Sequence, residues 1–203
     1  MRKFLFILSL YSIIISGSLF SYERYVLKCF EPLLQKSRDV LIKQVGTIEQ
    51  TNQNDGDMIK KYLKSVGLRE GYPYCAAGQY YCFKKAIEIL GCEENRIPIK
   101  RSGLAIEIFN HSKKFGERTV YKAQVDDLII WRKGSTPFGH IERIIMVMEK
   151  GWVKTVGFNT SKIIDNKRFE GVFIKKRNIY HRLTGMTIRG LTGFKPNSII
   201  KFQ

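Results

Sequence analysis

Two residues in this chain could together perform nucleophilic catalysis: a cysteine at the predicted start of a helix and a histidine at the predicted start of a strand. Cys75 follows a Gly-Tyr-Pro-Tyr turn, in which Pro73 disfavours helix for the residue before it and helps a helix to begin after it. The free amide groups and the positive end of a helix dipole stabilise a thiolate over a thiol. A cysteine on an apolar helix face is also typical of a core residue or of half a disulfide.

A cysteine nucleophile needs a base that takes its proton and returns it to the leaving group, and a third group that holds the base in one tautomer. His140 follows Gly139 after a loop rich in Gly, Ser and Pro, where an imidazole can face a cleft. His181 lies in a basic stretch, and His111 lies at a solvated helix end. We therefore predict His140 as the base. Asn159 ends the next predicted strand, and its amide oxygen would accept the imidazole N–H.

The first half of the chain favours helices, one of which carries the thiol. Apolar residues recur at helical spacing through residues 75–90, and Gly91 follows as a stop signal. Helices are also expected in three other segments, which are 25–45, 57–66 and 104–115.

A polar, amide-rich loop precedes the thiol helix in the sequence. Residues 46–56 are rich in turn formers, and such a loop either lines a cleft or is simply solvated. Glu49 and Asn54 in this loop, and Tyr74 beside the thiol, are our candidates for contacts with substrate.

The second half of the chain favours short antiparallel strands. Apolar or alternating segments are separated by turn-forming residues, and they cover residues 127–131, 141–148, 152–158 and 171–175. Helices followed by a run of strands predict an α+β fold, with one sheet packed on one helical layer. The tail from about residue 180, with three glycines, is basic and gives no recognisable element.

Length and charge limit the classes of protein to consider. The chain has 203 residues, 44% of them hydrophobic, which suits a single domain, predicted to span 22–203. Its net charge is +17, and residues 171–203 contain no acidic side chain. Such a charge favours an anionic partner, and cell-wall polymer or lipid headgroups fit as well as nucleic acid. Because no nucleic-acid-binding motif is present, we expect no specific nucleic acid partner.

The N-terminus predicts export. Residues 1–21 contain a basic start, an apolar run and small residues suited to cleavage, which together indicate a signal peptide. An uncleaved membrane anchor is the alternative. An exported protein can form disulfides, and if Cys75 is a free thiol, at most one bridge can form among Cys29, Cys82 and Cys92. Cysteine and histidine spacing does not suit zinc.

Four short motifs in this order resemble the CHAP family of cysteine, histidine-dependent amidohydrolases/peptidases, within the papain-like superfamily. They are Gly71-Tyr72-Pro73-Tyr74-Cys75-Ala76-Ala77, Asp127-Leu128-Ile129-Ile130-Trp131, Gly139-His140-Ile141 and Thr155-Val156-Gly157-Phe158-Asn159-Thr160. The resemblance covers residues from about 40 to 178. Each motif is short, and the specificity comes from their order and spacing.

The sequence departs from the family at informative positions. Asp126 and Glu142 stand where the family often has glycine, and Gly78 replaces a bulky apolar residue. Many members carry a glutamate two residues before the asparagine, where this chain has Gly157. An acid that orients the base is therefore absent or comes from elsewhere in the chain.

The resemblance implies a papain-like fold and an exported, monomeric enzyme that hydrolyses amide bonds in peptidoglycan stem peptides or cross-links. The hydrolysis that it implies requires neither metal nor cofactor. Cys75 would be the nucleophile, His140 the acid and base, and Asn159 the third residue, with the Cys75 backbone N–H as half of an oxyanion hole. An exported wall-binding protein of the same fold without activity is the alternative. A third class is a protein attracted by charge to nucleic acid or lipid.

Overall fold

The computed structural model describes residues 22–197, and the predicted signal peptide lies outside these residues. Within them the chain forms four α-helices and a seven-stranded sheet, which confirms the prediction of a mixed α+β protein. The helices are α1 (Glu31–Gln44), α2 (Asp57–Ser65), α3 (Cys75–Leu90) and α4 (Ala105–Phe115). Short 3-10 turns occupy Glu94–Arg96 and Glu149–Gly151.

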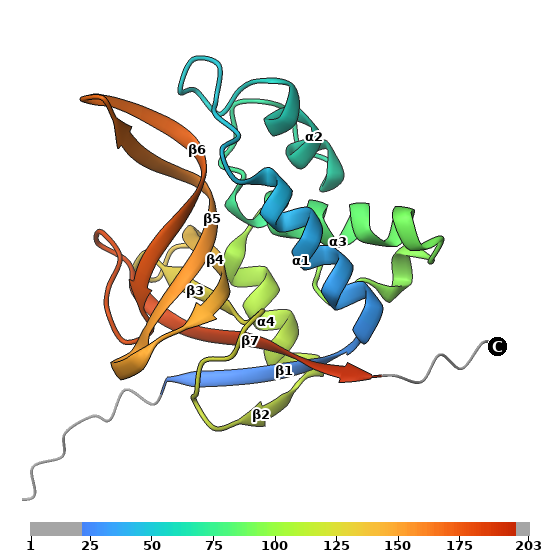
Figure 1. The fold of residues 1–203 in the computed structure, drawn as a ribbon. Coiled ribbons are helices and arrows are strands. Elements are labelled where there is room, and N and C mark those ends of the chain that lie inside the picture. Colours follow the sequence, from blue (N-terminus) through green and yellow to red (C-terminus); the bar gives the residue numbers. More distant parts are fainter. Residues whose placement is uncertain (1–21, 198–203) are drawn as a thin grey trace, which may run out of the picture.

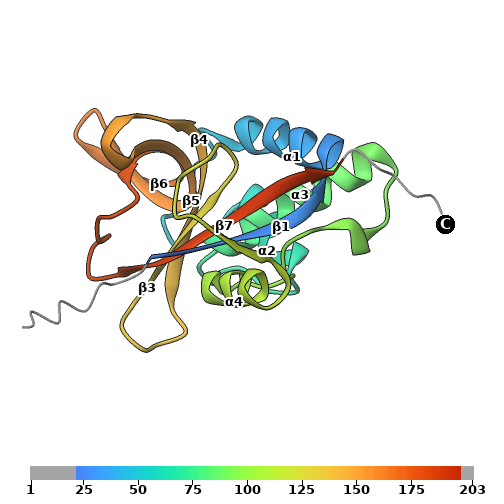
Figure 2. The ribbon, with the colours of Figure 1, turned by 90° about the horizontal axis from the view of Figure 1, so that it is seen from below.

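The strands are β1 (Glu23–Phe30), β2 (Glu117–Thr119), β3 (Leu128–Arg132), β4 (Gly139–Val147), β5 (Trp152–Ile164), β6 (Lys167–Asn178) and β7 (Thr187–Asn197). They are ordered β2-β1-β7-β3-β4-β5-β6, and every pair except β1 with β7 is antiparallel. The helices lie together beside the sheet, and the long β5–β6 hairpin curls away from the other strands (Figures 1 and 2).

At the N-terminal end of the domain one prediction was wrong, and at the other end the tail, which gave no recognisable element, forms a strand. Residues 23–30 form a strand, whereas helix was predicted from residue 25 onward, and the tail contains the long strand β7, which lies inside the sheet between β1 and β3. Strand β1 has no simple alternation of buried and exposed side chains, because the four consecutive residues from Arg24 to Leu27 are all buried, on both faces of the sheet. Helix α1 begins only after it, with Pro32 in its first turn.

Glycines are one reason why no element was recognisable from the sequence for β7. Gly193 packs against the buried ion pair of Arg24 and Asp127, in which Arg24 Nε lies 2.8 Å from Asp127 Oδ2. A Cβ atom at this position would lie 2.5 Å from the Arg24 guanidinium. Glycine at position 193 is therefore required by close packing inside the sheet.

The core lies mainly between the helices and one face of the sheet. Side chains of α1, α3 and α4 pack against β1, β3 and β4, and Leu33, Phe83, Phe109, Leu128 and Ile141 are representative members. A second cluster joins α2 and α3 to β5 and β6, and a third covers the opposite face of β3 and β4. Helix α3 thus contacts strands β4 and β5 directly and fixes the position of its first residue.

Candidate active site

The start of α3 places Cys75 against strand β4. Tyr74 precedes the helix, and its carbonyl accepts the Gly78 amide at 2.8 Å. Gly78 allows close approach to β5, because a Cβ atom there would lie 2.2 Å from the ring of Phe158. The glycine that departs from the family pattern thus brings α3 and its thiol onto the sheet.

His140 is the second residue of β4 and lies beside Cys75. The Cys75 Sγ is 4.0 Å from the carbonyl oxygen of Gly139, the residue before His140, and the thiol lies close enough to the imidazole to raise the pKa of His140. Gly139 has no room for a side chain, because a Cβ atom would lie 2.1 Å from the Trp131 carbonyl oxygen. The structure therefore brings together the two residues that the sequence predicted as nucleophile and base.

Glu142 is the side chain that contacts the other end of the imidazole. Its Oε1 lies 3.0 Å from Nε2 of His140, which leaves Nδ1 for the thiol. Glu142 is fully buried, and it also accepts bonds from Thr155 Oγ1 at 2.5 Å and from Arg177 Nη2 at 2.7 Å. Three donors thus hold the carboxylate in place, and the carboxylate holds the ring.

The electrostatics of this triad favour a charged imidazole. Burial by itself lowers the pKa of His140, but hydrogen bonds and charges from Cys75 and Glu142 outweigh burial and raise this pKa to about 9. Burial raises the pKa of Glu142, but His140 and Arg177 outweigh it and lower this pKa to about 2. At neutral pH the pair is therefore an imidazolium and a carboxylate.

Asn159 does not occupy the place predicted for it. It lies in the left-handed region at φ 56° within a bulge of β5, and the strand continues beyond it to Ile164. Its Nδ2 donates to Asn54 Oδ1 at 2.6 Å, whereas the acid on His140 is Glu142. The strand end that we expected after Phe158 was wrong because the bulge lets pairing with β6 resume at Thr160.

The register of β4 and β5 explains how Glu142 takes this position. Glu142 lies directly opposite Gly157, the position where many members of the resembled family carry glutamate. A Cβ atom on Gly157 would lie 2.9 Å from Oε1 of Glu142. The carboxylate thus comes from the neighbouring strand and fills the space above a glycine. The sequence does contain a signal for this contact. Glu142 is two residues after His140 in a predicted strand, and side chains two residues apart in a strand lie on the same face of the sheet.

The predicted substrate contacts form an internal network instead. Tyr74 is fully buried and Glu49 is 4% exposed, so neither side chain is open to a ligand. The Tyr74 hydroxyl donates to Glu49 Oε1 at 2.9 Å, and the backbone N–H of Asn54 donates to Oε2 at 2.7 Å. Asn54 in turn accepts the bond from Asn159. The network ties the loop, the residue before α3 and the β5 bulge together.

The remaining cysteines have a different environment from Cys75. All four are free thiols, so the structure contains none of the disulfides that export would permit. Burial raises the pKa of both Cys29 and Cys82 to about 12. Cys75 is thus the cysteine with a histidine partner, and the other two buried thiols are held protonated.

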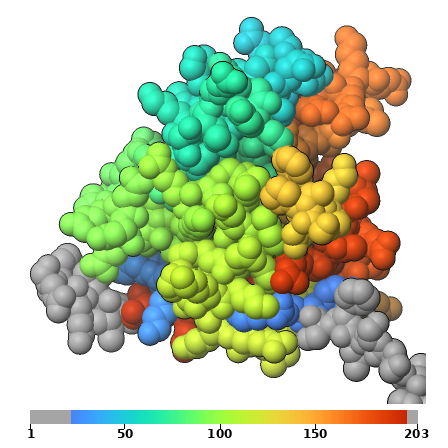
Figure 3. All heavy atoms as spheres, turned by 180° about the vertical axis from the view of Figure 1, so that it is seen from behind, coloured from blue at the N-terminus to red at the C-terminus, as the bar shows by residue number. Residues whose placement is uncertain are grey.

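Two cavities adjoin the catalytic pair. One of about 510 Å³ reaches Cys75 and is mainly apolar, with Leu68, Pro73, Leu104 and Phe138 in its wall. The other, of about 430 Å³, reaches His140 and is polar. Figure 3 shows the loop before β4, in yellow, between the yellow-green segment around α4 and the orange and red segments near the second cavity.

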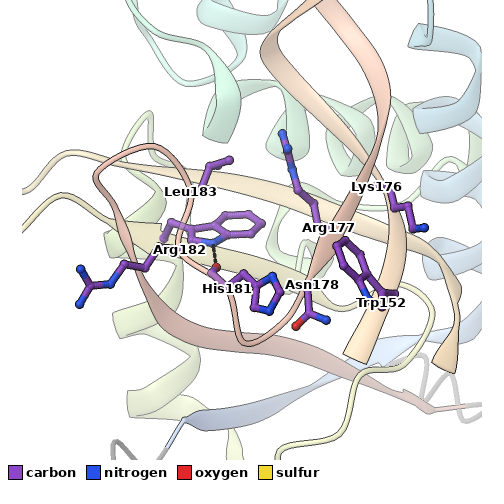
Figure 4. Close-up of a pocket in the computed structure, with 8 residues that line it drawn as sticks. Trp152, Lys176, Arg177, Asn178, His181, Arg182 and Leu183 are labelled. Atoms are coloured by element: carbon purple, nitrogen blue, oxygen red, sulfur yellow. Dashed lines mark hydrogen bonds between the residues drawn. The ribbon is translucent and has the colours of Figure 1, made fainter. Parts of the chain in front are cut away.

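A third cavity, of about 150 Å³, is lined by neither Cys75 nor His140 (Figure 4). Its wall includes Trp131, whose indole N–H donates to the His181 carbonyl at 3.2 Å, and Trp152, whose ring Lys176 covers at 4.9 Å. Arg177 also lines it, although its guanidinium binds Glu142. His181 therefore packs against Trp152 here, apart from the thiol.

Comparisons with known proteins give no relative for this chain: no protein-family model, curated protein or solved structure matches it significantly. Within residues 22–197, no helix has the length and apolar character needed to cross a bilayer. The same residues contain no group of three or more His, Cys, Asp or Glu side chains placed to hold a metal ion. The function is therefore argued from the site itself.

Proposed function

We propose that this protein is a cysteine-dependent amide hydrolase in which Cys75 is the nucleophile, His140 the general acid and base, and Glu142 a positioning residue. The observation that carries the proposal is the continuous contact from the Cys75 thiol through the His140 ring to the buried Glu142 carboxylate. A nucleophile, a base and an orienting acid in this order form the arrangement that acyl transfer requires.

The reaction follows from the charges. The Cys75 thiolate adds to the amide carbonyl carbon, and the oxyanion that forms lies near the free backbone N–H at the start of α3. The imidazolium gives its proton to the leaving nitrogen, the C–N bond breaks, and a thioester remains. A water molecule then attacks the thioester carbon, and His140 takes a proton from this water. The C–S bond breaks, and the Cys75 thiolate leaves.

For the substrate we propose an amide bond in a peptidoglycan stem peptide or cross-link. The support is the resemblance to the CHAP family in four ordered motifs, together with a net charge of +17 that suits an anionic wall. On the same basis we propose a papain-like fold, export by residues 1–21 and action as a monomer. Glu142, on the strand opposite Gly157, would supply the acid that this resemblance lacks at Gly157.

Digestion of purified peptidoglycan tests the proposal. Wild-type protein should release new primary amines and shorter muropeptides, identified by mass spectrometry, and Cys75→Ala should release none. Cys82→Ala is the matched control, since Cys82 lies seven residues further along the same helix and is fully buried. Equal digestion by wild type and Cys75→Ala would refute the nucleophile. Absence of products from a wild-type protein that still binds the wall would instead support the inactive wall-binding protein.

A further inference from the structure

The cavity that reaches His140 has a wall rich in cations, and the following inference rests on the proposed function. The cavity lies between the β5–β6 hairpin and the loop before β7. Its lining includes His140, Ser161, Arg168, Glu170, Lys175 and Arg177. Cys75 is not among them, and it lines the apolar cavity instead.

Proton transfer decides which part of the substrate enters each cavity. The imidazolium of His140 must reach the leaving nitrogen, whereas the Cys75 sulfur bonds to the carbonyl carbon. The chain that continues from the nitrogen therefore lies on the side of the imidazole. It follows that the amine portion of the substrate enters the cationic cavity, and that the acyl portion lies towards the apolar one.

The charges in the cationic cavity do not balance. Arg177 is paired with Glu142, and Arg168 with Glu170, at 2.7 Å in both cases. Lys175 forms no salt bridge with any carboxylate in residues 22–197, and its Nζ donates to the Ser161 carbonyl at 2.7 Å. An ammonium group has three donors, so two remain for a ligand.

The surroundings of Lys175 favour an anion. Burial and the nearby charges of Arg177 and Lys162 lower its pKa, while Glu142 acts in the opposite direction. Protonation of His140 adds another positive charge to the same wall. An anionic group beside Lys175 would relieve this repulsion, and it would be held in a partly desolvated place, where charge-assisted hydrogen bonds are strong.

We propose that this cavity binds a carboxylate of the substrate, carried by the first or second residue on the amine side of the scissile amide, with Lys175 as the specificity-determining contact. Stem peptides carry carboxylates that can be free or amidated, so the cavity would distinguish the two forms. This assigns to Lys175 a part in substrate choice and none in the chemical steps.

The neighbouring residue provides a matched control. Lys175 and Arg177 are two residues apart on β6 and share a face, whereas Lys176 faces the other way and covers the Trp152 ring at 4.9 Å. Figure 4 shows Lys176 and Arg177 pointing in different directions from β6. Loss of the Lys176 charge changes the net charge of the protein equally but leaves the cavity intact.

Mass spectrometry of wild-type digests first locates the amide that is cleaved, and the experiment then uses paired peptides that differ only in whether the residue on the amine side of that amide carries a free carboxylate or its amide. Wild-type protein should cleave the carboxylate form with a KM about tenfold lower than the amide form. Lys175→Met should lose this preference by raising the KM for the carboxylate form, with kcat little changed. Lys175→Arg should restore part of the preference, and Lys176→Met should behave as wild type.

Binding separates this inference from the proposed function. Cys75→Ala protein should bind the carboxylate form more tightly than the amide form in calorimetry, and Lys175→Met in that background should remove the difference. If the preference in binding is present but no variant cleaves, the hydrolase proposal fails and the carboxylate site stands. If wild type treats both forms alike, or Lys176→Met removes the preference as fully as Lys175→Met, the carboxylate site is refuted.

Discussion

Replacing Glu142 with glutamine removes the negative charge beside His140 but keeps the length of the side chain and an oxygen acceptor. In the native protein the carboxylate is fully buried, and its Oε1 lies 3.0 Å from Nε2 of His140. A hydrogen bond to a charged group contributes about 1.5–3 kcal/mol, and about 1.4 kcal/mol corresponds to a tenfold change in rate. If the bond supports the imidazolium in the transition state, kcat/KM falls by about 10- to 150-fold.

The same substitution changes the pH dependence. The alkaline limit of activity should follow loss of the imidazolium proton, because burial, which lowers the pKa of His140, is outweighed by its partners, which raise it to about 9. Without the Glu142 charge the imidazolium loses a partner and its pKa falls. The alkaline limb of the kcat/KM profile therefore moves to lower pH, which is measured by muropeptide release across the range where the protein stays folded.

A control separates a loss of stability from a loss of positioning. Asp127→Asn disrupts another buried carboxylate, whose partner is Arg24 at 2.8 Å, and it should lower the free energy of unfolding while leaving the alkaline limb in place. Both variants are compared with wild type by urea unfolding. The reasoning is refuted if Glu142→Gln keeps the wild-type kcat/KM and its wild-type pH dependence. The refutation is stronger if Asn159→Ala, in contrast, lowers kcat/KM and shifts the alkaline limb.

Three other predictions follow from named contacts. Iodoacetamide should modify Cys75 faster than Cys82 at neutral pH, because burial raises the pKa of Cys82 to about 12; peptide mass spectrometry measures this, and equal rates would contradict it. Gly157→Ala should lower the free energy of unfolding by about 1–3 kcal/mol and reduce activity, because its methyl group would meet Glu142; unchanged urea unfolding would contradict this. The stability from protonated His140 should be complete below its ordinary pKa of 6.5 and lost as the pH rises through about 9, so His140→Gln should flatten the curve of unfolding free energy in this range.

Many of the helices and strands could be predicted from the sequence, because local residue patterns determine them. Helix α3 runs from Cys75 to Leu90 as its periodicity predicts, and Gly91 follows it in the left-handed conformation. The segments expected as strands around Trp131, His140 and Trp152 are strands. The pairing of β1 with β7 could not be predicted from the sequence. It joins residues more than 160 positions apart, and no local pattern specifies so distant a partner.

By itself, the sequence determined the types of chemical group present and the local elements on which Cys75 and His140 stand, because helix and strand periodicity and turn residues act over a few positions. Only the tertiary structure decided which acid reaches the imidazole. Asn159 and Glu142 were both available near His140 in the chain, but a bulge carries Asn159 to Asn54, and the register of β4 on β5 places Glu142 over Gly157. The physical reason is that register and bulges fix side-chain neighbours across strands, and these depend on the packing of the whole sheet.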